Sequence, residues 1–494
     1  MINKSSQKIF NNSLLYAMGT VFSKAVGFFL VPIYTNYVSD AEYGVATTIT
    51  TFVSTFGIVI MLSLRAALIR FYNDYDEKEK QRFVGTLTCF VTLNAIVICL
   101  LLCLFNNLYR PFLFKDIDFY PLVFFGILSL GAEGIYLTYQ SLLQAKQDGK
   151  GYSINSIIYL LIHAVAVIVF VWALEMGALG IVLANFVTNA GFAVYGVISM
   201  FVKGLMRFAW DKSMLIRSLK YSLPILPHNL SNNLNTYAIK LVINNFIGYA
   251  LSGLYSLAAQ FSTIISLVQS SINLAFRPWF IEQMDKGEEG RAQIKFMSVM
   301  IMAIYSFAAV MISLFCKEIV LIMAEESYSD AWKMVPFFII SQIVAFIYYS
   351  HVQALMYNVE MSKYTVVCSL SGLAVNIGVS LLLVGPLNVY GVLIARFVSQ
   401  AAMAALTVVL SRRAEKIDFG LGKMILYVVL ATALAAVGMF ISSRNAGISI
   451  IEILLKLVVA VGAFMLFIFP YRKDFAGLLK GMLKRKSKKP KADA

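Results

Sequence analysis

The sequence predicts an all-α integral membrane protein with about fourteen transmembrane helices. Three observations lead to this fold class. The 494 residues are 60% hydrophobic and only 14% charged, with a mean hydropathy of +0.77, a balance that does not suit a surface covered by water. Apolar runs of about 20 residues, the length a spanning helix needs, recur along the chain. The third observation is an internal repeat.

Apolar runs between charged or turn-rich breaks give the expected spans. In chain order these are residues 10–37, 44–69, 83–105, 119–142, 153–174, 177–202, 220–246, 252–280, 296–323, 332–357, 364–385, 388–411, 421–442 and 447–470. The first run follows a short polar stub and lacks a small-residue cleavage pattern. We therefore expect a retained first helix and not a removed signal peptide.

The repeat relates the first six spans to the next six. Residues 180–190 match residues 391–401, with glycine, alanine and phenylalanine at equivalent places, and residues 36–45 match residues 245–254. The offsets, 211 and 209 residues, are nearly equal. Because six is an even number, the two halves have the same orientation, which predicts two six-helix lobes related by an axis along the membrane normal. The last two spans are an addition to this pair.

The basic residues set the orientation and explain most of the +15 net charge. With the N-terminus inside, 31 of the 41 Lys and Arg residues fall on the inner side, five in outer loops, among them Lys317, and five within spans. This asymmetry predicts cytoplasmic termini, and it gives no evidence for nucleic acid as a partner. The expected organisation is an N-lobe (1–202), an amphipathic linker (203–219), a C-lobe (220–411), two further spans (412–470) and a basic amphipathic tail (471–494).

Four cationic residues within the spans are candidates for a substrate cavity. Burying an isolated charge costs about 2.5–3.5 kcal/mol on insertion scales, so such a residue normally faces a cavity or a partner. Lys24 lies mid-way along the first span, Lys240 and Arg396 lie in the outer halves of the seventh and twelfth, and Arg65 lies near the inner end of the second. For Arg65 the alternative is that it reaches the inner headgroups.

The deep acidic and histidine residues are candidates for a second role. Glu133 is the only deep acid of the first lobe, and it either neutralises Lys24 or binds a coupling proton or sodium ion. His163 and His228 are weaker candidates, since a lone histidine among apolar residues is more often a hydrogen-bonded core residue. Glu452 and Lys456 are spaced i, i+4, which predicts that they pair with each other, in the bilayer or along a lipid groove.

Cations outnumber acids in the expected membrane interior, which favours an anionic substrate carrying phosphate groups. The sequence shows no Walker A, GxSxG, HExxH or clustered acidic motif, so we expect no enzyme chemistry, no metal site and no bound cofactor. The five cysteines lack paired spacing and are expected to be small buried hydrophobes.

The sequence resembles the oligosaccharide flippases of the polysaccharide transporter (Wzx-type) family, which share a superfamily with the multidrug (MATE) exporters and the lipid II flippases. The residues that carry the resemblance are 31–44 (VPIYTNYVSDAEYG), 64–71 (LRAALIRF), 223–227 (LPILP), Asn376, Gly385-Pro386 and 391–401. Together with the span count, the resemblance covers nearly the whole chain.

The resemblance implies alternating access between two lobes and translocation of an undecaprenyl-pyrophosphate-linked oligosaccharide repeat unit. The setting it implies is the bacterial cytoplasmic (inner) membrane, in O-antigen, lipopolysaccharide or capsule synthesis. Other partners would be membrane lipids and a polysaccharide polymerase or chain-length regulator. Lys24 is similar in place to a basic residue of the lipid II flippases, and Arg65 to their span-two arginine. Their span-eight arginine has no counterpart here, since Arg277 lies at the cytoplasmic end of its helix. In those relatives the two extra spans form a lipid-tail groove.

Three other functions remain open at this stage. A lipid II flippase would use the same cations for a different lipid-linked sugar. A cation-coupled exporter of drugs or metabolites would depend on Glu133 and coupling to a proton or sodium gradient. A membrane glycosyltransferase or polymerase would be expected to have larger outer loops than this chain, whose longest runs from about residue 106 to 118.

Overall fold

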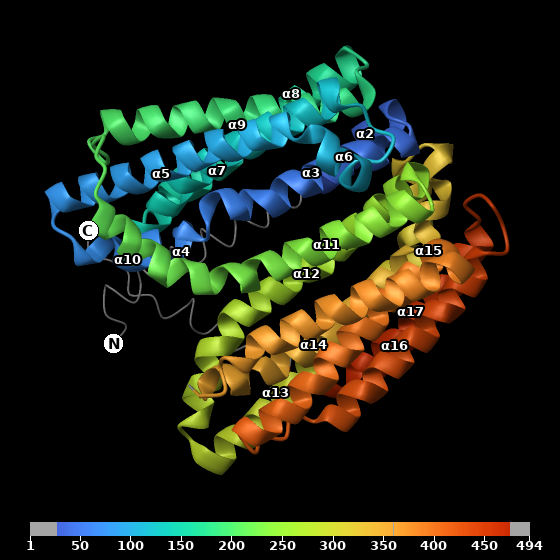
Figure 1. Ribbon diagram of the computed structural model, residues 1–494. Helices are drawn as coiled ribbons and strands as arrows, with labels where there is room; N and C mark the ends of the chain where they lie inside the picture. The colour runs from blue at the N-terminus through green and yellow to red at the C-terminus, as the bar shows by residue number, and fades with distance from the viewer. Residues whose placement is uncertain (1–26, 359, 475–494) are drawn as a thin grey trace, which may run out of the picture. The chain divides into compact units, whose positions relative to one another are not determined.

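The computed structural model describes residues 27–358 and 360–474, and these residues form an all-helical membrane protein (Figure 1). Eleven described helices are long and apolar enough to cross a membrane. One of them, α15, contains two expected spans, and α11 is a further expected span that is too polar to be counted among the eleven. The first expected span lies mostly outside the described residues. The fold class predicted from sequence is confirmed.

The elements follow the expected spans closely. They are α2 (Val31–Tyr37), α3 (Asp40–Met61), α4 (Leu64–Phe71), α5 (Glu77–Leu104), α6 (Asn106–Leu113), α7 (Phe124–Ala145), α8 (Gly149–Val167), α9 (Gly177–Val202), α10 (Lys212–Ser222), α11 (Leu226–Phe246), α12 (Tyr249–Met284), α13 (Gly287–Met323), α14 (Val335–Tyr357), α15 (Tyr364–Ala414), α16 (Leu421–Ser442) and α17 (Ile450–Phe467).

Two expected boundaries differ from those in the structure because of backbone conformation. The expected span 44–69 is divided into α3 and α4, since Leu62 and Ser63 both adopt positive φ angles, 46° and 57°, which a helix cannot accommodate. Conversely, α15 joins two expected spans, with a single non-helical residue, Asn388, at φ 54° between them. Its ψ of −142° is far from the helical value, so the chain changes direction at this residue.

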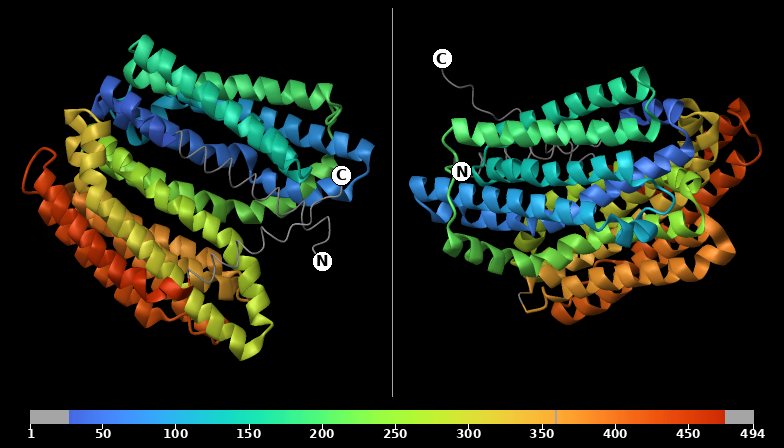
Figure 2. Two further views of the ribbon diagram at one scale, coloured as in Figure 1. Left: turned by 180° about the vertical axis from the view of Figure 1, so that it is seen from behind. Right: turned by 45° about the horizontal axis from the view of Figure 1, so that its top comes forward.

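The described residues divide into two compact units. Of the described residues, the first unit comprises 27–267, Met323–Ala331 and Ser369–Ser399, and the second comprises Val268–Ile322, 332–358, 360–368 and 400–474. In the first unit, α7 packs against α5, α9 and α3, and α3 also packs along α11 (Figures 1 and 2). In the second unit, α16 packs against α14 and α17. The core of the first unit is a continuous cluster of buried apolar side chains that includes Phe52, Phe83 and Leu130.

The internal repeat appears in the first unit as a symmetric helix crossing. Gly44 and Gly253, equivalent positions of the two repeats, lie at the contact, where a Cβ on Gly44 would be 2.0 Å from the carbonyl oxygen of Tyr249 and one on Gly253 would be 2.0 Å from that of Asp40. Asp40 and Tyr249 are themselves equivalent. One turn further on, the hydroxyl oxygens of Thr47 and Ser256, again equivalent and 209 residues apart, lie 3.1 Å from each other. Equivalent residues meet only where the repeat axis passes, so α3 and α12 cross on that axis.

Candidate functional site

Lys240 is a buried cation with no acidic partner. Its side chain lies in α11 and is 5% exposed. Among the described residues, no hydrogen bond or ion pair is recorded for its ammonium group. The first 26 residues, which the structure does not describe, contain no Asp or Glu, and the undescribed tail contains only Asp493. An ammonium group in this setting has lost its hydration without gaining a counter-ion, and it is available to an anionic ligand.

The polar residues of α11 have structural partners. Hydrogen bonds join two of its asparagines to α3, a third to Ser63 between α3 and α4, and a fourth to α15. The pairs are Asn244 with Thr48 (2.9 Å), Asn233 with the carbonyl of Ser54 (3.0 Å), Asn229 with Ser63 (3.2 Å) and Asn235 with Asn376 (2.8 Å). These asparagines, which make α11 less apolar than an ordinary span, are thus used in hydrogen bonds to neighbouring segments. Its asparagines therefore hold α11 in place, and Lys240 differs from them in having no such contact.

Arg65 and Arg396 are less isolated than Lys240. Arg65 lies in the first turn of α4, directly after the break at Leu62 and Ser63, and is exposed, with a guanidinium nitrogen 3.0 Å from the side-chain oxygen of Gln144. Arg396 is half-buried in α15 and forms a side-chain hydrogen bond with the Tyr255 hydroxyl. Both retain guanidinium donors for an anion, since an arginine has five N–H groups.

Glu133 lines a small polar cavity inside the first unit. The cavity has a volume of about 150 Å³. Its polar lining comes from α3, α7, α8 and α9, and consists of Thr50, Ser54, Ser129, Glu133, Tyr159, Asn185 and Asn189. The Glu133 Oε2 atom is buried and has no hydrogen-bond partner among the described residues. A carboxylate with adjacent amide and hydroxyl oxygens can supply the oxygen ligands of a small cation, and the carboxylate can alternatively bind a proton.

The walls of this cavity are fixed by their own hydrogen bonds. Asn189 donates to Ser129 (3.0 Å) and accepts from the Tyr159 hydroxyl (2.8 Å), and the Tyr159 ring stacks on Tyr136 at 4.8 Å. Gly57 of α3 lies against the carboxylate, since a Cβ there would be in ordinary contact with Oε2 of Glu133, at 3.4 Å. The cavity is therefore built around the carboxylate and does not arise from loose packing.

The histidine and Lys24 candidates are only partly described. The ring of His163 stacks near Tyr159, at 6.4 Å, and bonds to the backbone of Ala184, but it does not line the Glu133 cavity. Lys24 and the side chain of His228 lie outside the described part of the structure. Within the described part, no group of three or more His, Cys, Asp or Glu residues is placed to hold a metal ion.

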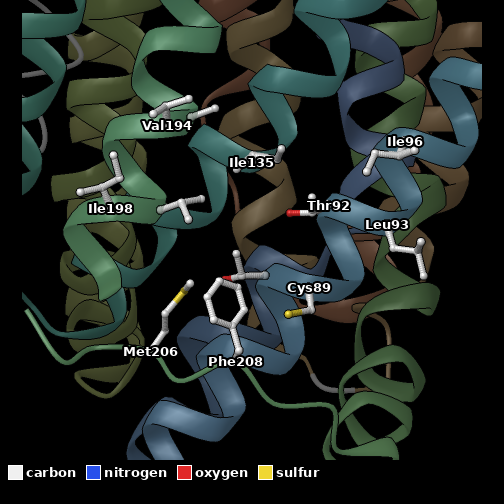
Figure 3. A pocket seen from close by; sticks show the side chains of 12 residues that line it. Cys89, Thr92, Leu93, Ile96, Ile135, Val194, Ile198, Met206 and Phe208 are labelled. Atoms are coloured by element: carbon white, nitrogen blue, oxygen red, sulfur yellow. The ribbon is translucent and has the colours of Figure 1, made fainter. Parts of the chain in front are cut away.

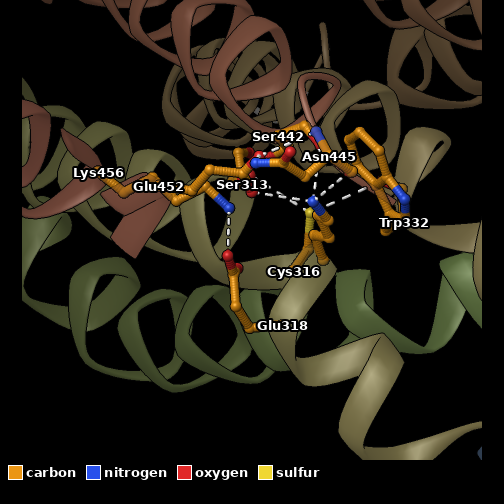
Figure 4. Close-up of polar contacts among 9 residues, drawn as sticks. Ser313, Cys316, Glu318, Trp332, Ser442, Asn445, Glu452 and Lys456 are labelled. Carbon is orange, nitrogen blue, oxygen red and sulfur yellow. Dashed lines mark hydrogen bonds and ion pairs between the residues drawn. The ribbon is translucent and has the colours of Figure 1, made fainter. Parts of the chain in front are cut away.

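Glu452 and Lys456 do not form the pair expected from their i, i+4 spacing (Figure 4). Lys456 is 2.5 Å from Oε1 of Glu318, and Glu452 is 2.9 Å from the ammonium of Lys317. Both new partners belong to α13. The spacing argument failed because the structure offers each residue an oppositely charged neighbour on the facing helix. Lys317, which we expected in an outer loop, is instead 1% exposed within α13.

The two ion pairs differ in how completely they are satisfied. The Lys317 ammonium uses all three donors, to Glu452 and to the carbonyls of Ser442 (2.9 Å) and Asn445 (2.8 Å). Glu452 accepts two further bonds from Asn445. Glu318, by contrast, leaves Oε2 buried without a partner among the described residues. These four residues are a neutral cluster that ties α17 to α13.

A separate apolar pocket opens on the first unit between α5, α7, α9 and the segment after α9 (Figure 3). Its volume is about 480 Å³. The labelled side chains include Leu93, Ile135, Val194, Ile198 and Phe208, and no charged residue lines it. A pocket of this composition fits hydrocarbon and cannot hold a phosphate or a sugar.

The fold defines a class, that of polytopic α-helical membrane proteins with an internal repeat. The described fold is similar to the lipid II flippase MurJ in its inward closed conformation, with a TM-score of 0.72 and 14% identity, covering 94% of this chain and 100% of that one. An inward-facing multidrug resistance transporter of the MATE family gives 0.65 at 12% identity, over 79% and 94% of the two chains. The Vibrio cholerae MATE transporter VcmN gives 0.58 at 13%, over 83% and 96%. These likenesses concern the fold.

The family is given by the sequence itself. The family described as "Polysaccharide biosynthesis protein" matches residues 9–284, more than half of the chain, so the chain belongs to this family. A curated relative, "Lsg locus putative protein 1" of Haemophilus influenzae (strain ATCC 51907 / DSM 11121 / KW20 / Rd), is 22% identical over 280 residues. The match covers 56% of this chain and 66% of the relative, just under two thirds of its length. The family expected from sequence is confirmed.

Proposed function

We propose that this protein is a flippase that carries an undecaprenyl-pyrophosphate-linked oligosaccharide repeat unit across the bacterial cytoplasmic membrane. The observation that carries the proposal is Lys240, a buried ammonium group with no carboxylate beside it among the described residues. A pyrophosphate supplies the missing negative charge. Family membership, and a fold shared with a protein named as a lipid II flippase, support the same activity.

In the proposed mechanism the cations hold the phosphate and do no covalent chemistry. Lys24 and Lys240 supply point charges, while Arg65 and Arg396 supply planar forks that match phosphate oxygens. Their attraction for phosphate is strong because a low-dielectric cavity screens it little. The two lobes then rock about the bound headgroup, as parallel repeats permit. The protein would act as a transporter and not an enzyme, with both termini in the cytoplasm and a polymerase or chain-length regulator receiving the product.

The Glu133 cavity supports ion coupling of this cycle. Its unpartnered carboxylate and the hydroxyl and amide groups of Ser129, Asn185 and Asn189 form a site of the right size for one proton or one sodium ion. In the proposal, occupancy of the cavity by the ion alternates with occupancy of the cationic site by substrate. The energy of an ion gradient would then be available for translocation.

The test is a flipping assay in proteoliposomes. A fluorescent polyprenyl-pyrophosphate-linked oligosaccharide is incorporated, and the fraction protected from a membrane-impermeant quencher is followed with time. We expect K240A to lower the initial rate about tenfold or more, since a hydrogen bond to a charged group contributes about 1.5–3 kcal/mol. K240R should retain part of the rate. K78A, in the first turn of α5, is a matched control that removes an exposed lysine.

Two results would contradict the proposal. One is a wild-type flipping rate in K240A. The other is protein-dependent movement of an organic cation dye with no movement of the lipid-linked sugar. That second result would favour the cation-coupled exporter, the alternative supported by the Glu133 cavity. Movement of lipid II with exclusion of other lipid-linked sugars would retain the flippase activity and change its substrate.

A further inference from the structure

A polar pocket lies in the second unit at the end of α15, and none of the residues of the proposed transport cycle lines it. Its volume is about 340 Å³. It is lined by the end of α15, the segment that leads to α16, and one residue of α14: Arg412, Lys416, Ile417, Asp418, Phe419, Leu421 and His351. The segment is anchored rather than loose, since Phe419 is 2% exposed and its ring lies 4.4 Å from that of His351.

The acidic residues around this pocket are already neutralised. Asp418 lies 2.6 Å from the ammonium of Lys295 and accepts a hydrogen bond from the backbone N–H of Gly420 at 2.8 Å. Glu415, which precedes it, lies 4.0 Å from Arg291. A ligand in the pocket would therefore meet little free negative charge.

Among the residues that line the pocket, the basic residues Arg412 and Lys416 outnumber the one acid, Asp418, which Lys295 already pairs with. Of the two, only Arg412 interacts electrostatically with Asp418. No ion pair or hydrogen bond is recorded between the side chain of Arg412 or Lys416 and any described residue. The pocket thus holds an excess of two positive charges. Cations at the end of a helix also interact favourably with its dipole, but that interaction does not need the pocket that the exposed side chains of Arg412 and Lys416 line together.

His351 adds a fixed polar group to the same wall. Its side chain is 3% exposed, and its Nδ1 atom lies 2.8 Å from the carbonyl oxygen of Ile347. That bond fixes the ring orientation and leaves Nε2 as the other polar atom of the ring. Because the proton that meets the Ile347 carbonyl is on Nδ1, Nε2 of the neutral ring is an acceptor, so His351 shapes the wall and Arg412 and Lys416 supply the donors that suit a phosphate group.

We propose that the pocket lined by Arg412, Lys416 and His351 is a binding site for a phosphate group. Its apolar walls, Ile417, Phe419 and Leu421, and a volume larger than one phosphate leave room for a small organic substituent. Two sources share this chemistry. One is the headgroup of an anionic phospholipid, which basic pockets between membrane helices bind, and the other is a soluble phosphate compound. This site is distinct from the cations assigned to transport, and it does not rest on the flippase proposal.

The experiment measures thermal unfolding of the purified full-length protein in a neutral detergent, with three probes. Short-chain phosphatidylglycerol represents the lipid source, inorganic phosphate the soluble source, and short-chain phosphatidylcholine an uncharged control headgroup. We expect phosphatidylglycerol or inorganic phosphate, but not phosphatidylcholine, to raise the melting midpoint by about 2 °C or more at saturation. The probe that raises it identifies the source.

The variants R412A and K416A identify the pocket. Each should weaken the apparent affinity for the active probe about tenfold, the effect expected from losing one charged contact to phosphate. The matched controls are R413A and K423A, which remove neighbouring exposed cations that do not line the pocket and should leave the affinity unchanged.

K416Q provides an independent arm, because it removes the charge of Lys416 and keeps a long polar side chain. Lys416 is exposed and makes no recorded contact with a described side chain, so its replacement should leave the unliganded melting midpoint at the wild-type value. Two results would overturn the proposal: no shift with phosphatidylglycerol or inorganic phosphate, or equal shifts in wild type, R412A and K416Q.

Discussion

Buried lysines have opposite surroundings in the two units of this protein. In the second unit, Lys317 and Lys456 are 1% and 0% exposed, and each contacts a carboxylate. In the first unit, Lys240 is 5% exposed and contacts none among the described residues. The residue type and the depth of burial are alike, so neither distinguishes a structural lysine from a functional one. The presence of a counter-ion does.

The energetic argument behind this comparison is simple. A buried ion pair with good geometry roughly recovers the cost of desolvating its two charges. An unpaired buried lysine recovers nothing until a ligand arrives. Lys317 and Lys456 therefore have their desolvation largely offset in the absence of substrate, whereas Lys240 is a cost that binding of an anion would offset.

The largest expected effect is on stability, from breaking one ion pair of the second unit. K456M would leave Glu318 buried without its cation, and removing one partner of a buried pair typically costs about 3–5 kcal/mol. Glu318 already has one carboxylate oxygen without a hydrogen bond, so little remains to compensate it. The measurement is the free energy of unfolding in detergent from a denaturant titration.

A double variant is the control for this prediction. K456M/E318M replaces the whole pair with apolar side chains of similar volume, a change that is often neutral or stabilising. We expect it to recover most of the stability that K456M loses. If the double variant were as unstable as K456M, the two residues would not act as a pair.

The ion pairs also show the limit of prediction from sequence. Span positions, the repeat and the family were predicted because hydropathy and residue identity are local properties that a sequence displays directly. The pairing of Glu452 was wrong because the i, i+4 rule considers only one helix, and the structure places α13 alongside with Lys317 and Glu318 on it.

The candidate site shows the same division between what sequence reveals and what it hides. The burial of Lys240 was predicted, since a lysine in an apolar run must lie somewhere deep. That Asn229, Asn233 and Asn244 of the same helix bond to α3 and Ser63 could not be predicted. Such contacts depend on how two helices distant in sequence approach each other.

The next prediction concerns Lys240 itself, where removing the charge should not lower the free energy of unfolding as it does in K456M. K240M removes an unpaired buried charge, so the free energy of unfolding should stay the same or rise by about 1 kcal/mol, while flipping of the lipid-linked sugar falls about tenfold or more. Stability and transport are measured on the same preparation, with K456M beside it. A loss of stability as large as that of K456M would mean that Lys240 has a structural counter-ion.

Glu133 extends the comparison to an unpaired acid. E133Q keeps the volume and can hydrogen-bond much as a protonated carboxyl does, so we expect unfolding free energy within about 1 kcal/mol of wild type. Acceleration of flipping by an imposed proton or sodium gradient should be abolished, while exchange without a gradient persists. Assays in proteoliposomes with and without the gradient measure gradient-driven flipping and gradient-independent exchange separately. Retention of full gradient dependence in E133Q would place ion coupling elsewhere.

The smallest effect is expected for a pair exposed to solvent, Lys295 and Asp418, whose side chains are 51% and 65% exposed. The hydrogen bond from Lys295, followed by that from the Gly420 N–H, lowers the pKa of Asp418 below its ordinary value of 3.8. A carboxyl with a lowered pKa stabilises the folded state at pH values above its ordinary pKa, and this contribution is lost as the pH falls through the lower folded value.

At pH 7, D418N should therefore cost only about 0.2–1 kcal/mol, the usual range for exposed pairs. The difference from wild type should shrink as the pH falls below about 4, in unfolding titrations of both proteins from pH 7 to 3. A difference that stayed constant over this range would show that the Asp418 carboxylate stabilises the protein through its shape and hydrogen bonds and not its charge. If the difference shrinks as expected, charged residues fall into three groups by their effect on stability: exposed, buried with a partner, and buried without one. Lys240 alone among the buried lysines described here would depend on a ligand for its counter-ion.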